Sequence, residues 1–257
     1  MMSNYFGLFE KTVLCCFYKL FSKKIGSPVL IVGCGHSGTS LLLSILSAHP
    51  DFMAVSQETN MFLNLSKKNL ISQIYDLNTK TKINRKKRWV EKTPKHITCL
   101  NRIFDVIPNA KVIIMIRDGR DVAYSHMKRG TSLEEGMNRW INDNLAAKPF
   151  YNNKNIYLLK YESIIENFYF SIKNLLAFLD EPYFTSVEKY YETEKLFYSP
   201  VVFRPKVYNE STHNQYRNWQ INQPIFDSRS QWINLNKDEI YLLESMGGQL
   251  LGEFNYI

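Results

Sequence analysis

The sequence is poor in cysteine, and its four cysteines form no recognisable pattern. Cys15 and Cys16 are adjacent, while Cys34 and Cys99 stand alone. None of these positions has the spacing of a zinc site, and no disulfide framework is indicated. A reducing compartment is therefore the simpler expectation, and we predict a cytoplasmic protein.

Long apolar runs are also lacking near the start of the chain. The longest run of the first 27 residues, Val13 to Tyr18, lies between Lys11 and Lys19. It is far shorter than the ~20 residues that span a bilayer, and the segment lacks the layout of a signal peptide. We expect residues 1–27 to form an N-terminal helical extension packed on the protein. Weak peripheral contact of residues 5–24 with a membrane is the alternative.

The composition is that of an ordinary globular protein with an excess of positive charge. The chain has 257 residues, of which 45% are hydrophobic and 22% charged, and its net charge is +8. This length suffices for one large α/β domain. The positive charge favours an anionic ligand, but it does not distinguish nucleic acid, acidic glycan, membrane surface or a polyphosphorylated nucleotide.

From residue 28 onward, segments that predict strands alternate with segments that predict helices. Short apolar runs of this kind are typical of buried parallel strands, and the alternation predicts an α/β fold with helices on both faces of a central parallel sheet. We assign residues 28–257 to one domain. The polar stretch 66–88 is interpreted mainly as a surface excursion. The predicted strands are 29–33, 52–55, 88–92, 111–117 and 156–161.

A glycine-rich segment follows the first predicted strand. The pattern G-x-x-x-x-G-K-[ST] fits from Gly33 through Gly38 to Ser40, except that Thr39 stands in place of lysine. The glycines let the backbone approach a phosphate, and the following helix adds its N-terminal N–H groups and dipole. We therefore predict an anion site in a P-loop-like three-layer fold. The missing lysine disfavours a triphosphate, whereas a ligand with one phosphate and a neighbouring sulfonate needs neither this lysine nor a metal. The residues assigned to the loop are Gly35, His36, Ser37, Gly38, Thr39 and Ser40.

A second candidate anion site follows the strand 111–117. Arg117 ends this strand, and Ser125 and Arg129 lie four residues apart on the following helix or just after it, hence on one face. Two guanidinium groups and a hydroxyl at a strand end suit a phosphate monoester. The alternative is a capped helix whose arginines pair with Asp118 and Asp121.

Three segments together resemble the sulfotransferases, over about residues 29–180. They read GCGHSGTSLLLSILSAHP, EKTPKHI and IRDGRDVAYSHMKRG. The bacterial and tyrosylprotein branches are the most similar, since they share the run SGT…AHP…ET. The resemblance implies an enzyme that uses 3′-phosphoadenosine-5′-phosphosulfate (PAPS) as donor. Its acceptor would be a hydroxyl group of a glycan, glycolipid, small metabolite or tyrosine, and no metal would be needed.

The resemblance also implies which residues bind the donor. The loop Gly35 to Ser40 matches the family's 5′-phosphosulfate loop, and Arg117 and Ser125 match its 3′-phosphate pair. Arg129 matches a further arginine of the tyrosylprotein branch. The late segment STHNQYRNW is interpreted as a loop that closes over the 3′-phosphate, with Arg217 as its cation.

The catalytic candidates come from the same comparison. Glu58 of QET matches the proposed general base, and Lys92 of EKTP matches a lysine that assists the departing sulfuryl group. His36 is the third candidate, and it stands where the family usually has arginine or lysine. Asn60 stands where the tyrosylprotein branch has an arginine after ET, which weakens the case for an acidic peptide acceptor.

Two other classes of function compete with this interpretation. A P-loop kinase of small molecules would use ATP and Mg²⁺, but Thr39 and Arg117 replace the lysine and the metal-binding aspartate that it needs. A nucleic-acid binder would depend on the charge and on the run KTKINRKKR at 80–88, which has no aromatic residue until Trp89. We expect a nucleotide donor and a hydroxyl acceptor as partners, and no nucleic acid.

Overall fold

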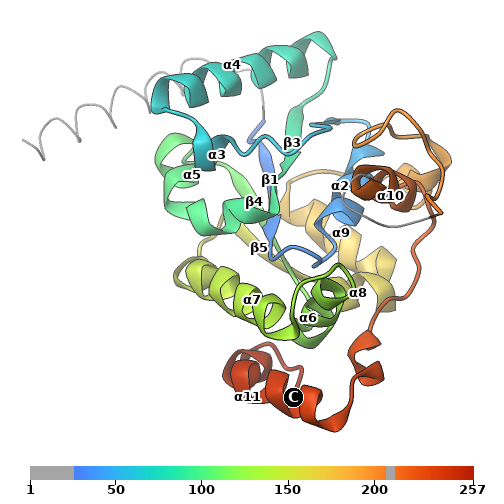
Figure 1. Cartoon of the computed structure of the whole chain (residues 1–257). Coiled ribbons are helices and arrows are strands. Elements are labelled where there is room, and N and C mark those ends of the chain that lie inside the picture. The colour runs from blue at the N-terminus through green and yellow to red at the C-terminus, as the bar shows by residue number, and fades with distance from the viewer. Residues whose placement is uncertain (1–25, 207–211) are drawn as a thin grey trace, which may run out of the picture.

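A parallel sheet with the strand order β2–β3–β1–β4–β5 forms the centre of the fold (Figure 1). The computed structural model describes residues 26–206 and 212–257. All the predicted strands are present, and each ends within one residue of its expected bounds. They are β1 Val29–Gly33, β2 Phe52–Ala54, β3 Arg88–Lys92, β4 Lys111–Ile116 and β5 Ile156–Lys160.

The central strand β1 marks the place where the strand order changes direction. The chain first builds β2 and β3 on one side of β1 and then β4 and β5 on the other. In parallel sheets of this kind, ligands bind outside the carboxyl ends of the strands beside such a switch point. The glycine-rich loop follows the carboxyl end of β1, so it lies at this place.

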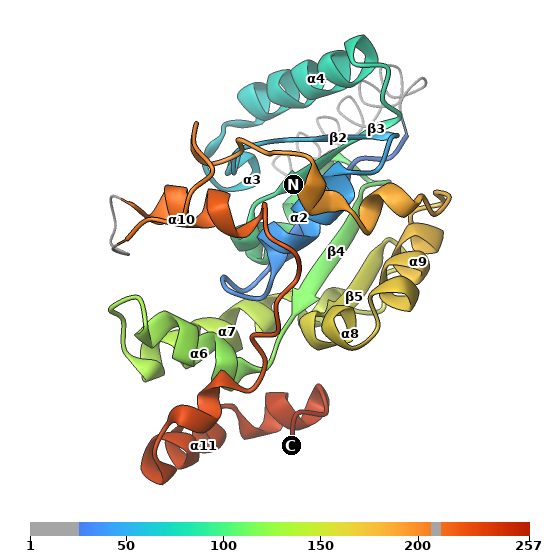
Figure 2. The same cartoon turned by 90° about the vertical axis from the view of Figure 1, so that its right-hand side faces the viewer.

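Helices cover both faces of the sheet, which confirms the predicted three-layer α/β architecture (Figure 2). Alternate residues of β1 enter the two cores: Leu30 and Val32 pack on one face, and Val29 and Ile31 on the other. The first face is covered by α4, α5, α6, α7 and α11, and the second by α2, α8 and α9. The helices are α2 Thr39–Ser47, α3 Met61–Asn64, α4 Lys67–Ile83, α5 Leu100–Val106, α6 Gly119–Met127, α7 Leu133–Ala147, α8 Tyr161–Glu166, α9 Phe168–Phe178, α10 His213–Gln220 and α11 Lys237–Glu253, with short 3₁₀ turns that include η1 Pro94–Cys99 and η4 Tyr190–Glu192.

The interpretation of residues 66–88 as a surface excursion is wrong. Residues 67–83 form the helix α4, whose N-cap Ser66 accepts a hydrogen bond from the backbone of Asn69. Leu70, Ile74 and Leu77 are buried on one side of this helix. The remaining positions are mostly Lys, Asn, Gln and Thr, so the polar composition concealed a narrow apolar stripe with helical spacing.

The part of the chain that the structure describes has no helix that is both long and apolar enough to cross a membrane. Residues 1–25 and 207–211 lie outside the described residues. The expected helical extension and the segment 5–24 therefore fall outside this description, apart from residues 26 and 27.

Candidate active site

The loop between β1 and α2 is shaped by two glycines. A Cβ atom on Gly33 would lie 2.6 Å from the carbonyl oxygen of Met115, and one on Gly38 would lie 2.8 Å from the ring of Tyr161. Gly38 also has a φ of +89°, which side-chain-bearing residues rarely adopt. The Ser37 hydroxyl is fully buried and forms no hydrogen bond with the described residues. The loop thus presents a buried polar group at the N-terminus of α2, as an anion site requires.

His36 contacts the second predicted anion site directly. Its Nδ1 lies 3.3 Å from the hydroxyl of Ser125, and its ring lies edge-on to that of His126 with 4.4 Å between centroids. Burial, and then the positive charge of Arg129, lower the pKa of His36 to about 2. The ring is therefore neutral at physiological pH. It offers a hydrogen-bonding nitrogen rather than a positive charge.

Arg117 lies against the same loop. Its Nη1 donates to the backbone carbonyl of His36 at 3.0 Å, and its guanidinium lies over the ring of Tyr161, 4.6 Å from the centroid. Nη2 donates to the backbone carbonyl of Ser228 and lies 3.7 Å from the Asp121 carboxylate. The structure therefore brings Arg117 beside the loop, and it also contains the contact with Asp121 that the capped-helix alternative predicts.

Glu58, in the segment between β2 and α3, lies between two cations. Its Oε1 is 2.5 Å from Nζ of Lys92 and 2.7 Å from Nη2 of Arg217. Burial acts to raise the pKa of Glu58, but the charges of Lys92 and Arg217 outweigh it and hold the pKa below its usual value. Glu58 is therefore ionised and able to accept a proton once its partners move.

Arg217 has a place that the sequence did not predict. It comes from α10, which lies beside α2 (Figure 2), and its Nη2 is 3.3 Å from the hydroxyl of Ser40. Its guanidinium also stacks on the ring of Tyr198 at 4.0 Å from the centroid. Arg217 thus joins the loop and Glu58, whereas we expected it beside a 3′-phosphate.

Arg139 is a cation of the site that sequence reasoning missed. A Cβ atom on Gly35 would lie 3.2 Å from Nη2 of Arg139, so the guanidinium packs against the loop. Arg139 also lowers the pKa of both His36 and His126. It comes from the middle of α7, where no motif marks it, and the only sequence signal is its helical spacing of four from Asp143, 3.8 Å away.

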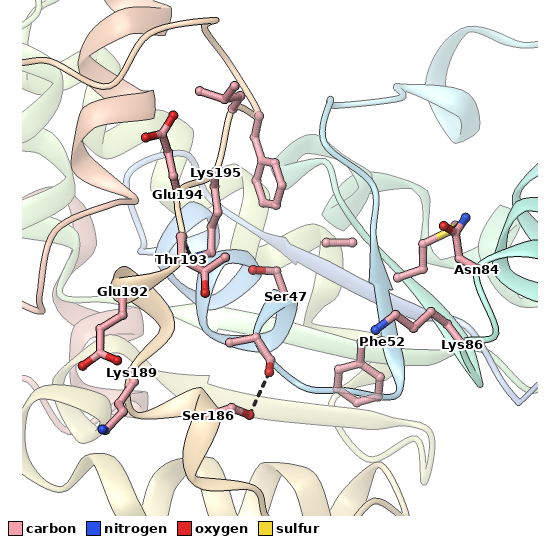
Figure 3. A pocket seen from close by; sticks show the side chains of 15 residues that line it. Ser47, Phe52, Asn84, Lys86, Ser186, Lys189, Glu192, Thr193, Glu194 and Lys195 are labelled. Carbon is pink, nitrogen blue, oxygen red and sulfur yellow. Dashed lines mark hydrogen bonds between the residues drawn. The ribbon is translucent and has the colours of Figure 1, made fainter.

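A separate hollow lies at the other end of α2, remote from the loop (Figure 3). Its volume is ≈ 650 Å³, and Ser47, Phe52 and the segment 192–197 line it. Burial lowers the pKa of Lys195 to about 8, and its ammonium donates to the backbone carbonyl of Thr193 at 2.9 Å. None of the predicted site residues lines this hollow, so it is not part of the candidate active site.

One group of side chains could be taken for a metal site. The ligand atoms of His49, Asp51 and Glu181 all lie within 4.8 Å of one another. However, Lys87 pairs with Asp51 at 2.6 Å and Arg88 pairs with Glu181 at 2.9 Å. These cations pair with both carboxylates, so the group is an ion-pair network that ties the start of β3 to the start of β2 and to the segment after α9.

The fold and the loop define an α/β enzyme of the P-loop-like class, and comparison with known proteins narrows this class. Residues 56–185, just over half of the chain, match the model described as "Sulfotransferase family". The chain therefore belongs to the sulfotransferase family, whose members transfer sulfuryl groups. A search of curated proteins gave no match.

Solved structures of sulfotransferases share the fold at low sequence identity. Mouse sulfotransferase SULT7A1 complexed with PAP is 16% identical, with 88% of this chain and 84% of that chain covered and a TM-score of 0.60. Sulfotransferase STF9 from Mycobacterium avium is 10% identical, with coverages of 93% and 81% and a TM-score of 0.57. The sulfotransferase domain of the Synechococcus PCC 7002 olefin synthase is 14% identical, with coverages of 88% and 96% and a TM-score of 0.54.

Proposed function

We propose that this sulfotransferase moves the sulfuryl group of PAPS to a hydroxyl acceptor by in-line transfer, with Glu58 as general base. The observation that carries the proposal is the continuity of the site. His36 of the loop contacts both Arg117 and Ser125. Glu58 contacts Lys92 and Arg217. Arg217 in turn contacts Ser40 of the same loop. The PAP complex of mouse SULT7A1 supports a donor of this class, because that protein shares the fold.

The donor would contact two parts of this site. The backbone and hydroxyl groups of residues 35–40 would hold the 5′-phosphate and the sulfuryl oxygens, as the N-terminus of a helix does for anions generally. Arg117 and Ser125, with Arg129 nearby, would hold the 3′-phosphate. Arg139 would add positive charge behind Gly35, which compensates for the neutral ring of His36.

In the transfer step, the acceptor oxygen forms a bond to sulfur while the bond from sulfur to the bridging oxygen of the donor breaks. The acceptor proton passes to Glu58, and the electron pair of the broken bond stays on the departing 3′,5′-bisphosphate. Lys92 and Arg217 would bind the sulfuryl and bridging oxygens, where negative charge develops. When they leave Glu58 for the donor, the pKa of Glu58 rises and it becomes a stronger base.

The cationic side chains of this site would supply the positive charge that a kinase obtains from Mg²⁺. We therefore propose transfer without a metal. We also propose a cytoplasmic enzyme whose transferase domain comprises residues 28–257. Cys34 and Cys99 are free thiols in the structure, in keeping with a reducing compartment. The acceptor class is a glycan, glycolipid, small metabolite or tyrosine.

Titration calorimetry with 3′,5′-adenosine bisphosphate, and separately with ATP and Mg²⁺, tests the donor. We expect micromolar binding of the bisphosphate and a loss of about 10- to 100-fold in affinity in Arg117→Ala, since hydrogen bonds to a charged group contribute about 1.5–3 kcal/mol. Lys148→Ala is the control, because it removes one positive charge from an exposed pair with Glu253. Tight binding of ATP with Mg²⁺ and no response to the bisphosphate would instead identify a kinase.

A further inference from the structure

The carboxyl end of β3 carries two charged neighbours that point to opposite faces of the sheet. Lys92 contacts Glu58, as described above, whereas Glu91 points to the other face because side chains alternate along a strand. Glu91 is fully buried, and the transfer chemistry assigns it no role. A buried carboxylate is costly unless it is hydrogen-bonded, so its partners are informative.

One oxygen of Glu91 holds the segment that follows Glu58. Oε1 accepts hydrogen bonds from the backbone N–H of Thr59 at 3.2 Å, from the Thr59 hydroxyl at 2.9 Å and from the Thr93 hydroxyl at 2.5 Å. Thr93 Oγ1 in turn accepts from the backbone N–H of Asn60 at 3.4 Å. This one oxygen thus accepts three hydrogen bonds, two of them from Thr59.

The other oxygen of Glu91 lies beside His96, which contacts the start of α3. Oε2 lies 3.3 Å from Nδ1 of His96, which is also fully buried. Nε2 of His96 accepts from the backbone N–H of Phe62 at 3.3 Å. The contact between Nδ1 and Oε2 lacks hydrogen-bond geometry, so both atoms are buried without a hydrogen-bond partner among the described residues. The backbone N–H groups of Thr59, Asn60 and Phe62 are therefore all held from β3 and η1.

The segment 58–62 consequently straddles the end of β3. Glu58 meets Lys92 on one face, and the next residue, Thr59, meets Glu91 on the other. Asn60, which follows these two contacts, has a φ of +49°, and its N–H bond to Thr93 helps to hold this backbone conformation. We propose that Glu91 is a positioning residue for the transfer reaction: it fixes the backbone of residues 59–62 and thereby the carboxylate of Glu58. This inference rests on the proposed function of Glu58 as base.

Glu91→Gln tests the proposal, because the amide keeps the shape but not the charge. We expect kcat for the conversion of PAPS to the bisphosphate, with water as acceptor, to fall about 10- to 100-fold, since small misplacements of a reacting group have effects of this size. The KM for PAPS and the affinity for the bisphosphate should change less than about twofold. Amide hydrogen exchange of Thr59 should accelerate, because a neutral amide oxygen accepts its hydrogen bond less strongly than a carboxylate. Exchange of Asn60 and Phe62 should accelerate to a smaller extent, because their acceptors Thr93 and His96 both contact Glu91.

Thr93 provides a second pair of variants in case Glu91→Gln folds poorly. Thr93→Val removes the hydroxyl that links Glu91 to Asn60 and should lower kcat, while Thr93→Ser keeps the hydroxyl and should retain wild-type turnover. Glu181→Gln is the matched control, because Glu181 is a buried carboxylate paired with Arg88 at the opposite end of β3. An equal loss of kcat in Glu181→Gln would show a general effect of stability and overturn the positioning role.

Glu58→Gln separates the two ways in which the reasoning can fail. If Glu58→Gln loses about 10²- to 10⁴-fold in kcat, as expected for a general base, and Glu91→Gln keeps its turnover, the proposed function stands and the positioning role is wrong. If Glu58→Gln turns over PAPS like the wild type, the base assignment itself is wrong. Loss of kcat in both variants, with unchanged bisphosphate affinity, supports both proposals.

Discussion

At the scale of single residues, His36 shows how the environment of a side chain sets its chemistry. It occupies the loop position where the resemblance to the sulfotransferases leads us to expect arginine or lysine. Burial and the charge of Arg129 hold its pKa at about 2, so the ring stays neutral. The positive charge is supplied from elsewhere, by Arg139 behind Gly35 and by Arg217 beside Ser40. Charge at this site is therefore a property of several helices and not of the loop alone.

The neutral state of His36 predicts a pH dependence of stability. Its pKa is about 2 in the folded protein and about 6.5 in the unfolded chain. Between these values the unfolded state binds the additional proton, so this contribution to stability is complete above about pH 6.5 and is lost as the pH falls. The loss is about 1.4 kcal/mol per pH unit, or about 2 kcal/mol by pH 5.

His36→Asn should remove this dependence, and asparagine tolerates the φ of +69° at this position. Urea unfolding at pH 7 and at pH 5 gives the decrease in the free energy of unfolding between these two pH values. This decrease should be about 2 kcal/mol smaller in His36→Asn than in the wild type. The wild type provides the reference for all other titrating groups. An identical fall in both proteins would contradict a neutral, buried His36.

At the scale of elements, α4 shows how a helix is stabilised by few apolar residues. Leu70, Ile74 and Leu77 are buried against the sheet, while Lys67, Lys68, Lys80 and Lys82 give the helix a polar sequence. The helix contributes to the core that includes Trp89 of β3, whose indole N–H donates to Asn78 of α4 at 2.8 Å. α4 therefore supports the strand that positions Glu91 and Lys92.

Two isoleucines of α4 test this account. Ile74 is 4% exposed and Ile83 is 74% exposed. Ile74→Ala should lower the free energy of unfolding by about 2–5 kcal/mol, because it leaves a cavity in the core. Ile83→Ala, the control on the same helix, should change it by less than about 0.5 kcal/mol. Denaturant unfolding of both variants measures the difference, and equal effects would show that α4 does not pack as described.

At the scale of the whole molecule, the C-terminal helix α11 braces the candidate active site through α7. Arg120 of α6 pairs with Glu244 of α11 at 2.6 Å, and α6, α7 and α11 lie together on one side of the sheet (Figure 1). Trp140 of α7 is enclosed in this group, and its indole N–H donates to the backbone carbonyl of Arg117 at 2.9 Å. Helix α11 thus helps to hold Arg117 in place through its contact with Trp140.

Gly119→Ala tests this link. A Cβ atom on Gly119 would lie 2.7 Å from the rigid ring of Trp140, so either the ring or α6 must shift. We expect a loss of about 1–3 kcal/mol in the free energy of unfolding, as for other overpacked cores, and weaker binding of the bisphosphate through Arg117.

Gly252→Ala is the control for this variant, because a Cβ atom there meets nothing within 4 Å. It should raise the stability by about 0.4–1 kcal/mol and leave bisphosphate affinity unchanged. Calorimetric titration and denaturant unfolding of the two variants distinguish the outcomes. Gly119→Ala with the stability and affinity of Gly252→Ala would refute the brace.

The sequence by itself determined the strands, their parallel arrangement and the loop that follows β1. These features are local: a buried strand needs only a short apolar run, and the loop lies within residues 33–40. The proximity of Arg117 and Ser125 could also be predicted from the sequence, because both residues lie in one strand–helix unit. The helix α4 could not be recognised, since three buried apolar side chains in a polar segment give a weak signal.

Tertiary structure alone decided the electrostatics of the site. The contact of Glu58 with Lys92 joins residues 34 positions apart, and its contact with Arg217 joins residues 159 positions apart. Arg139 lies on a helix without any motif, and Glu91 is distinguished from Lys92 only by the face of β3 that each one takes. Charge interactions depend on distance and burial, and neither quantity can be read from sequence spacing once the chain folds back on itself.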